Sequence, residues 1–172
     1  MKPVKPGKLL QQLVAEQDEL QFAQFTFDDA YAIGVDLVET ARNNGLKIAI
    51  DIAVNGQQLF HAALPGTSPD NDQWIVRKNR VVGRFFTSSY YVAKLLESQG
   101  RSIEEAYGLS ANEFPPFGGA VPIAVRGTGV IGTTTVSGLP DEDDHKTVVD
   151  AIRRHIGRTG ETGQKRSPAD RG

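Results

Sequence analysis

The fold is decided by the stretch Gly118-Gly119-Ala120-Val121-Pro122-Ile123-Ala124-Val125-Arg126-Gly127-Thr128-Gly129-Val130-Ile131-Gly132-Thr133-Thr134-Thr135-Val136-Ser137-Gly138. Two runs rich in β-branched residues flank a glycine-containing centre, which is the pattern of a β-hairpin. We predict a two-residue type II′ turn with Gly127 as its first central residue. That turn pairs Val125 with Val130 and Ile123 with Gly132. Because Gly132 has no side chain, we expect another element to approach it closely.

The composition indicates one globular domain. The chain has 172 residues, a formal net charge of −2 and a pI near 5.9, so it lacks the basic field of a nucleic-acid or membrane-surface protein. It has no apolar run of about 18 residues that could span a bilayer. It has no cysteine, which excludes disulfides, thiolate nucleophiles and cysteine metal sites. We predict a soluble, cytoplasmic protein without nucleic-acid or membrane partners.

The segments before the hairpin show helical and strand periodicity in turn. Thr26 and Asp29 have the spacing of a capping box, and Gly45 can end the helix that they open. Asn55-Gly56 is a strong hairpin signal, and a two-residue loop there would place His61 opposite Ile50. The predicted elements are a helix over 9–19, a short strand over 21–25, a helix over 26–44, strands over 48–54 and 59–64, a helix over 73–98 and a short helix after Ser102.

The helix predicted over 73–98 carries two apolar faces, one through Trp74 and Val81 and the other through Ile75 and Val82. In a chain of this length we expect a second copy to cover one of them, so we predict a homo-oligomer formed through this helix. A further helix is predicted from Asp141 to about Ile156. Hairpins and helices together predict a single α+β domain with an antiparallel sheet of about five strands. We predict a flexible arm at 1–8, the domain at 9–156 and a disordered tail at 157–172.

The first candidate for chemistry is His145, one turn into the last predicted helix. It could be an axial or metal ligand or an acid–base group, and the alternative is a structural histidine at a helix start. The acids at 141–144 favour a helix N-terminus. We expect them to form a solvated capping turn, and a divalent cation held by two of them with His145 is the alternative.

The remaining candidates are ligand-binding residues, each with a structural alternative. His61 lies on a predicted strand beside the loop at 65–67. Arg77 and Lys78 could pair with an anionic group, or form a solvated or inter-subunit face. Phe117, Gly118, Gly119 and Ser137 could form a pocket rim at the start and end of the hairpin. No nucleophile–base–acid set is visible, and Ser137 is not in a Gly-x-Ser-x-Gly elbow, so whether the protein is an enzyme stays open.

Several segments form a recognisable set, and they are Asp51-Ile52, Asn55-Gly56-Gln57-Gln58-Leu59-Phe60, Leu64-Pro65-Gly66-Thr67-Ser68-Pro69-Asp70-Asn71, Trp74-Ile75, Arg77-Lys78, Ser88-Ser89-Tyr90, Gly118-Gly119, Pro122-Ile123, Thr135-Val136-Ser137-Gly138-Leu139-Pro140 and Asp144-His145. Together they resemble the heme-degrading-domain proteins, similar to the GlcG and HbpS heme-binding group with its uncharacterised bacterial and yeast branch. The resemblance covers about Leu9 to Ile156.

The resemblance implies a profilin-like fold assembled into homo-oligomers, with heme as the cofactor to expect. It also implies a small-molecule binding protein of the heme or tetrapyrrole type, with weak heme-degrading activity as an extension. The chain has no histidine in its first two predicted helices, where an axial ligand is expected, and in this it departs from the usual heme-binding members. The alternative function is a non-enzymatic oligomeric scaffold or adaptor protein without heme.

Overall fold

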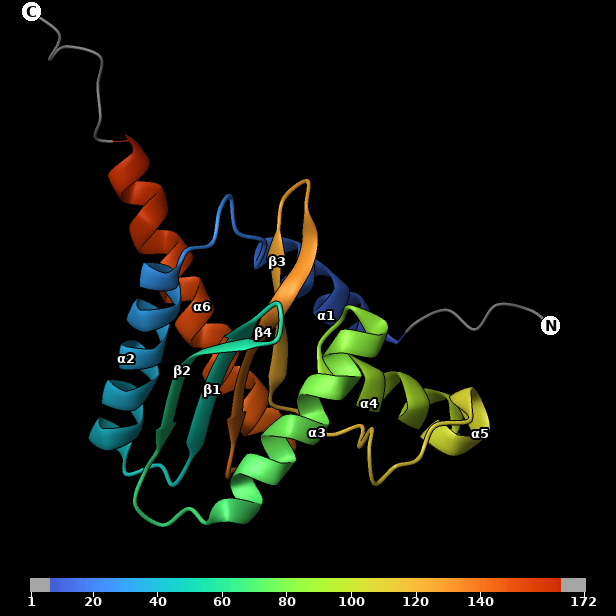
Figure 1. Ribbon diagram of the computed structural model, residues 1–172. Helices are drawn as coiled ribbons and strands as arrows, with labels where there is room; N and C mark the ends of the chain where they lie inside the picture. The colour runs from blue at the N-terminus through green and yellow to red at the C-terminus, as the bar shows by residue number, and fades with distance from the viewer. Residues whose placement is uncertain (1–6, 165–172) are drawn as a thin grey trace, which may run out of the picture.

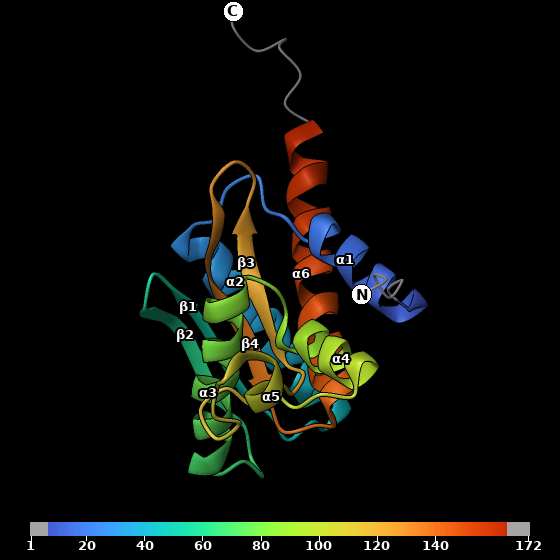
Figure 2. The same ribbon diagram turned by 90° about the vertical axis from the view of Figure 1, so that its right-hand side faces the viewer.

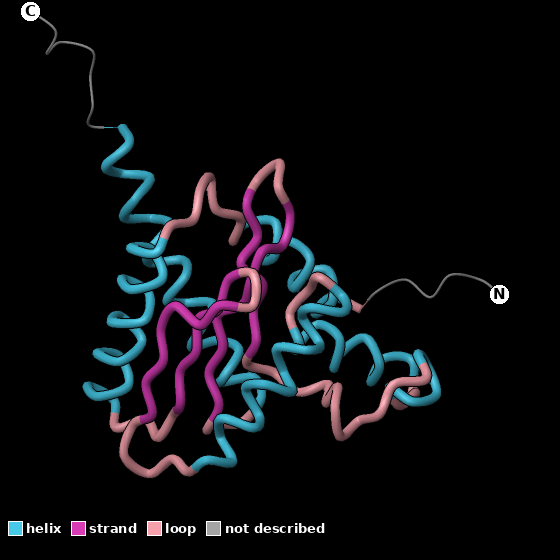
Figure 3. Tube along the Cα trace, in the orientation of Figure 1, coloured by secondary structure: helices cyan, strands magenta, loops and turns pink. Residues whose placement is uncertain are grey.

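The computed structural model describes residues 7–164 and contains one four-stranded antiparallel sheet. Its strands are β1 (Ala49–Val54), β2 (Gln57–Ala63), β3 (Ala120–Val125) and β4 (Gly129–Ser137), in the spatial order β2-β1-β4-β3. Figure 3 shows the strands in magenta and the two hairpin turns in pink. The two hairpins therefore meet along β1 and β4 in the middle of the sheet.

Helices cover both faces of the sheet (Figure 1). On one face α2 (Phe27–Asn44) and α6 (Asp141–Gln164) pack on an aliphatic core that includes Ile50, Ile123 and Val136. On the other face lies α3 (Pro69–Phe85). Beside α6, as Figure 2 shows, lie α1 (Lys8–Glu19) and α4 (Ser89–Gln99), followed in the chain by the short α5 (Ile103–Tyr107).

Local sequence signals account for the ends of several helices. Thr26 and Asp29 form a capping box at the start of α2, and Gly45 ends it in the left-handed conformation. The α+β class with an antiparallel sheet flanked by helices is confirmed. The expected fifth strand is not: within residues 7–164 the segment 21–25 contributes only one isolated bridge, from Phe22 to Val125.

Both hairpins contain a register shift that the sequence analysis did not predict. In the first, the shift between Ile52 and Ala53 places His61 opposite Asp51 rather than Ile50, so the predicted pairing is wrong and His61 faces away from the aliphatic core. In the second, Ile123 pairs with Gly132 as predicted, but Val125 pairs with Gly129 and not Val130. The turn itself is closed by a bond from Thr128 N to Val125 O, so Gly127, at φ +75°, is the second central residue.

The long helix predicted over 73–98 is two helices. Phe86 ends α3 in the left-handed conformation at φ +55°, and Ser88 then caps α4 with its side chain. The break lets α4 fold back, so Val81 of α3 packs against Val92 and Leu96 of α4. The apolar face that we assigned to a second subunit is therefore covered in large part by the same chain.

The last helix is longer than predicted. We placed its end near Ile156, and α6 continues to Gln164. The part of the predicted disordered tail at 157–164 is therefore helical, and residues 165–172 lie outside the described residues, as does most of the predicted arm. Among residues 7–164, no helix combines the length and apolar character needed to cross a membrane.

A substitution at Gly132 tests the close contact between β4 and β1 in the middle of the sheet. A Cβ at this position would collide with the carbonyl oxygen of Ala53 on β1. We expect Gly132→Ala to lower the free energy of unfolding by about 1–3 kcal/mol in urea titrations. Gly83→Ala is the control, because Gly83 lies in α3 with open space around it. That substitution should stabilise the protein by up to about 1 kcal/mol. Equal effects of the two substitutions would contradict the contact.

Candidate functional site

The first turn of α6 lies between two pockets, and consecutive residues of this turn contribute to different ones. Asp144 lines a pocket with α3, and His145 lines a pocket with α1. Both side chains are buried, with exposed fractions of 1% for Asp144 and 5% for His145. The expectation that the acids at 141–144 are all solvated is therefore wrong for Asp144, which is buried.

A buried ion pair joins α6 to α3. The ammonium group of Lys78 donates to Asp144 Oδ2 at 2.9 Å and to the carbonyl oxygen of Val136 at 3.4 Å. Asp144 also accepts from the backbone N–H groups of Gly138 and Leu139. Burial raises the pKa of the Asp144 carboxyl, and these partners offset part of that rise. The charge of Lys78 is thus engaged inside the protein.

The first pocket, here called the Trp74 pocket, has a volume of about 400 Å³. Trp74 and Phe117 form its aromatic wall, with ring centroids 5.4 Å apart. The guanidinium carbon of Arg77 lies 4.0 Å from the centroid of the Trp74 ring. The pocket is acidic: its charged lining residues are Asp70, Asp141, Asp144 and Lys78.

The structure brings most of the predicted ligand-binding residues together at the Trp74 pocket. Lys78, Phe117 and Ser137 line it. Gly118 and Gly119 lie behind it. A Cβ at Gly118 would collide with the backbone of Asp141, and a Cβ at Gly119 would lie 2.8 Å from Nζ of Lys78. Burial also raises the pKa of the Asp141 carboxyl, against the effect of Lys78.

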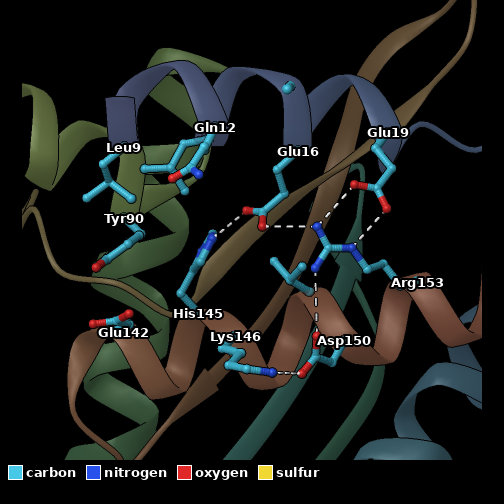
Figure 4. Close-up of a pocket in the computed structure, with 13 residues that line it drawn as sticks. Leu9, Gln12, Glu16, Glu19, Tyr90, Glu142, His145, Lys146, Asp150 and Arg153 are labelled. Carbon is cyan, nitrogen blue, oxygen red and sulfur yellow. Dashed lines mark hydrogen bonds and ion pairs between the residues drawn. The ribbon is translucent and has the colours of Figure 1, made fainter. Parts of the chain in front are cut away.

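The second pocket, here called the α1–α6 pocket, has a volume of about 500 Å³. Figure 4 shows it between α1 above and α6 below, with Tyr90 of α4 at one end. Its apolar wall is formed by Leu9, Leu13, Ala15 and Val149. Ligand pockets commonly have about 300–1,000 Å³, so this pocket has the size of one. Its other lining residues are polar or charged and include the carboxylates of Glu16, Glu19, Glu142 and Asp150.

His145 is held in the α1–α6 pocket by contacts on two sides. Its Nε2 lies 2.6 Å from Oε1 of Glu16, and its ring stacks on Tyr90 with centroids 4.8 Å apart. Its Nδ1 is buried and has no hydrogen-bond partner among residues 7–164. A buried imidazole nitrogen without a hydrogen-bond partner is unusual in a folded protein, which makes His145 a candidate functional residue.

Ion pairs between α1 and α6 rim this pocket, as the dashed lines of Figure 4 show. Arg153 binds Glu19 at 2.9 Å and Glu16 at 3.4 Å, and Lys146 pairs with Asp150. The hydrogen bond from Arg153 lowers the pKa of Glu19. Burial raises the pKa of the Tyr90 hydroxyl. Arg153 thus contacts carboxylates of both helices, whereas Lys146 pairs with Asp150 of its own helix.

The structure separates His61 from both pockets. It lies on β2, and its Nε2 binds Asp72 of α3 at 2.8 Å. Within the described residues no group of three or more His, Asp or Glu side chains is close enough to hold a metal ion. The metal site that we predicted at His145 therefore has no complete set of amino-acid ligands in this part of the chain.

Sequence reasoning missed several residues that line the pockets. Glu16 and Arg153 are separated by most of the chain, so no local pattern relates them. Trp74 was assigned to an apolar helix face, although Asp70 four residues before it and Arg77 three residues after it were visible as helix neighbours. That spacing is the one signal that could have identified the Trp74 pocket.

Comparison with known proteins assigns this chain to a family. The model for "Haem degrading protein HbpS-like" matches residues 25–153. A UPF0303 protein of Streptomyces coelicolor is 49% identical over 146 residues, which cover 85% of this chain and 92% of the relative. The chain belongs to the HbpS-like family.

Two solved structures share the fold of this chain. The crystal structure of Ybr137w matches with a TM-score of 0.81 at 30% identity, covering 87% of this chain and 88% of that chain. The crystal structure of a PduOC:heme complex matches with a TM-score of 0.62 at 16% identity, covering 77% and 94%. At that identity the second match shows a common fold only.

The residues of the α1–α6 pocket of this HbpS-like chain fit a heme-type ligand in their chemistry. His145 offers an imidazole, the aliphatic wall suits a flat apolar macrocycle, and the exposed Lys146 suits a ligand carboxylate. The four carboxylates of the lining oppose an anionic ligand, so its carboxylates would have to lie at the rim beside Lys146. The Trp74 pocket fits less well, because it is lined by no histidine and its lysine is already paired with Asp144.

The buried ion pair gives a test of how the site is held. We expect Lys78→Met or Asp144→Leu alone to lower the free energy of unfolding by about 3–5 kcal/mol, because each leaves a buried charge unpaired. The double variant should lose clearly less than the sum of the two, as measured in urea titrations. Lys94→Met, which removes an exposed pair with Glu97, should cost less than about 1 kcal/mol. Additive losses for the double variant would refute a direct pair.

Proposed function

We propose that this protein binds a heme or related tetrapyrrole in the α1–α6 pocket. The observation that carries the proposal is the imidazole of His145, whose Nε2 faces Glu16 across a pocket of about 500 Å³. Membership of the HbpS-like family supports it, as does the common fold with a protein solved in complex with heme.

The pocket residues have distinct roles in this proposal. His145 would hold the iron, and Tyr90 keeps the ring of His145 in position by stacking on it. Leu9, Leu13 and Val149 would contact the macrocycle. Lys146 would bind a carboxylate of the ligand, while Arg153 stays with Glu16 and Glu19. Bound heme would supply an iron centre capable of oxidative chemistry, and weak degradation of heme stays a prediction beyond binding.

A hemin titration tests the proposal. We expect purified protein to shift the visible absorption band of hemin, and His145→Ala to weaken binding at least about tenfold by removing the nitrogen ligand. His61→Ala is the matched control, because His61 is paired with Asp72 outside the pocket. Binding by wild-type protein that His145→Ala leaves unchanged would contradict this site. No band shift with wild-type protein would contradict the function.

Self-association remains a second proposal, now with a different basis. The break at Phe86 leaves this side chain 60% exposed, and Val76 on α3 is 46% exposed. Val76 and Phe86 lie ten positions apart, so they are separate exposed side chains, and Phe86, the larger and more exposed, is the contact that we propose for a second copy. The oligomeric scaffold of the alternative function rests on the same contact.

Light scattering at micromolar protein concentration tests this second proposal. We expect a mass that is a multiple of 18.7 kDa for the wild-type chain. Phe86→Asp should shift that mass toward a single chain, because it places a charge in the proposed contact. Tyr107→Asp, which alters an exposed aromatic residue on α5, is the control. A wild-type mass of 18.7 kDa would remove the proposal.

A further inference from the structure

Glu16 contacts Nε2 of His145, the ring nitrogen that has a polar side chain as its partner. It extends from α1 across the α1–α6 pocket, and its Oε1 lies 2.6 Å from Nε2 of His145 (Figure 4). The other nitrogen, Nδ1, is buried. Glu16 lines the pocket, so Nε2 is the nitrogen that faces it, and a ligand that binds the imidazole from the pocket must take the position that Glu16 holds.

This contact also determines where the imidazole proton lies. An ionised carboxylate only accepts hydrogen bonds, so Nε2 carries the proton while Glu16 binds it. A nitrogen that carries a proton cannot donate a lone pair to a metal. Nδ1 has no partner among residues 7–164, so it is free to take that proton when Nε2 gives it up.

We propose that Glu16 restricts ligand binding at His145 by holding the imidazole in its Nε2–H form. This inference rests on the proposed function, since it concerns the same pocket. A ligand that binds Nε2 displaces the carboxylate, and the proton moves from Nε2 to Nδ1. No proton leaves the imidazole, and its net charge does not change.

Arg153 provides the place to which Glu16 moves. Its Nη2 already lies 3.4 Å from Oε2 of Glu16, and it is 2.9 Å from Glu19 through Nε. When Glu16 leaves His145, its carboxylate thus keeps a cationic partner and does not become an unpaired charge in a partly buried site. The contact with His145 can therefore open without leaving Glu16 unpaired, and the cost is the hydrogen bond to His145 itself.

The alternative role of Glu16 predicts the opposite result. If the iron bound Nδ1, Glu16 would orient the ring from the far side and would strengthen binding, as carboxylates do for many metal-bound histidines. Removing Glu16 would then weaken the complex. The sign of the change in affinity separates the two roles.

The experiment compares Glu16→Ala, Glu16→Gln and Glu19→Ala in hemin titrations. Glu19 is the matched control, because it binds Arg153 but not His145. We expect Glu16→Ala to bind hemin on the order of tenfold more tightly than wild type, since a hydrogen bond to a charged group no longer has to be broken. Glu16→Gln should give a smaller gain, and Glu19→Ala should stay within about twofold. Unchanged or weaker binding by folded Glu16→Ala overturns the proposal.

A second measurement tests Glu16 without any heme. In protein with ¹⁵N-labelled histidine, the ring nitrogen shifts show which nitrogen carries the proton. We expect the Nε2–H form of His145 in wild type and in Glu19→Ala, and a changed shift pattern in Glu16→Ala. The same pattern in all three overturns the proposal. If no variant binds hemin but Glu16→Ala changes the pattern, the heme function fails while the hold of Glu16 on His145 stands.

Discussion

The buried ion pair between Lys78 and Asp144 is the constraint on which the rest of the structure depends. It joins the middle of α3, the end of β4 and the first turn of α6, because Asp144 also accepts from two backbone N–H groups after β4. Both side chains are nearly inaccessible to solvent. Two charges without water must remain paired, so these three elements cannot shift independently. Gly119 permits this packing, since a side chain there would press on the Lys78 ammonium.

Fixing Asp144 also fixes His145, the next residue of the same helical turn. Successive residues on a helix point about a quarter-turn or more apart, so one side chain enters the pocket with α3 and the other enters the pocket with α1. The four-stranded sheet sets this geometry indirectly, because β4 delivers the chain to α6 through Gly138. That residue lies against the backbone of Lys47 and has φ +153°. The position of the imidazole is thus a consequence of how β4 ends.

Features that depend on neighbouring residues could be predicted from the sequence, and features that depend on distant residues could not. The capping box at Thr26, the end of α2 at Gly45 and the turn at Asn55-Gly56 all follow from residues within a few positions. The shift that turned His61 toward Asp51 depends on how β1 accommodates an extra residue of β2, which alternation does not show. The break at Phe86 was missed because two apolar stripes pass through it, and only the contact of α4 with α3 shows why the chain turns. The partner of His145 lies 129 positions away, beyond the reach of any motif.

The two pockets differ in how firmly their cations are held, although each is lined by more carboxylates than cations. In the Trp74 pocket the cation is Lys78, and drawing it toward a ligand would leave Asp144 buried and unpaired, at a cost of about 3–5 kcal/mol. In the α1–α6 pocket the cations are Lys146 and Arg153, with side chains 68% and 39% exposed. Exposed ion pairs contribute about 0–1 kcal/mol, so Lys146 can exchange Asp150 for a carboxylate on a ligand at little cost. Arg153 then stays available to Glu16, which can leave His145 because Arg153 is already within reach.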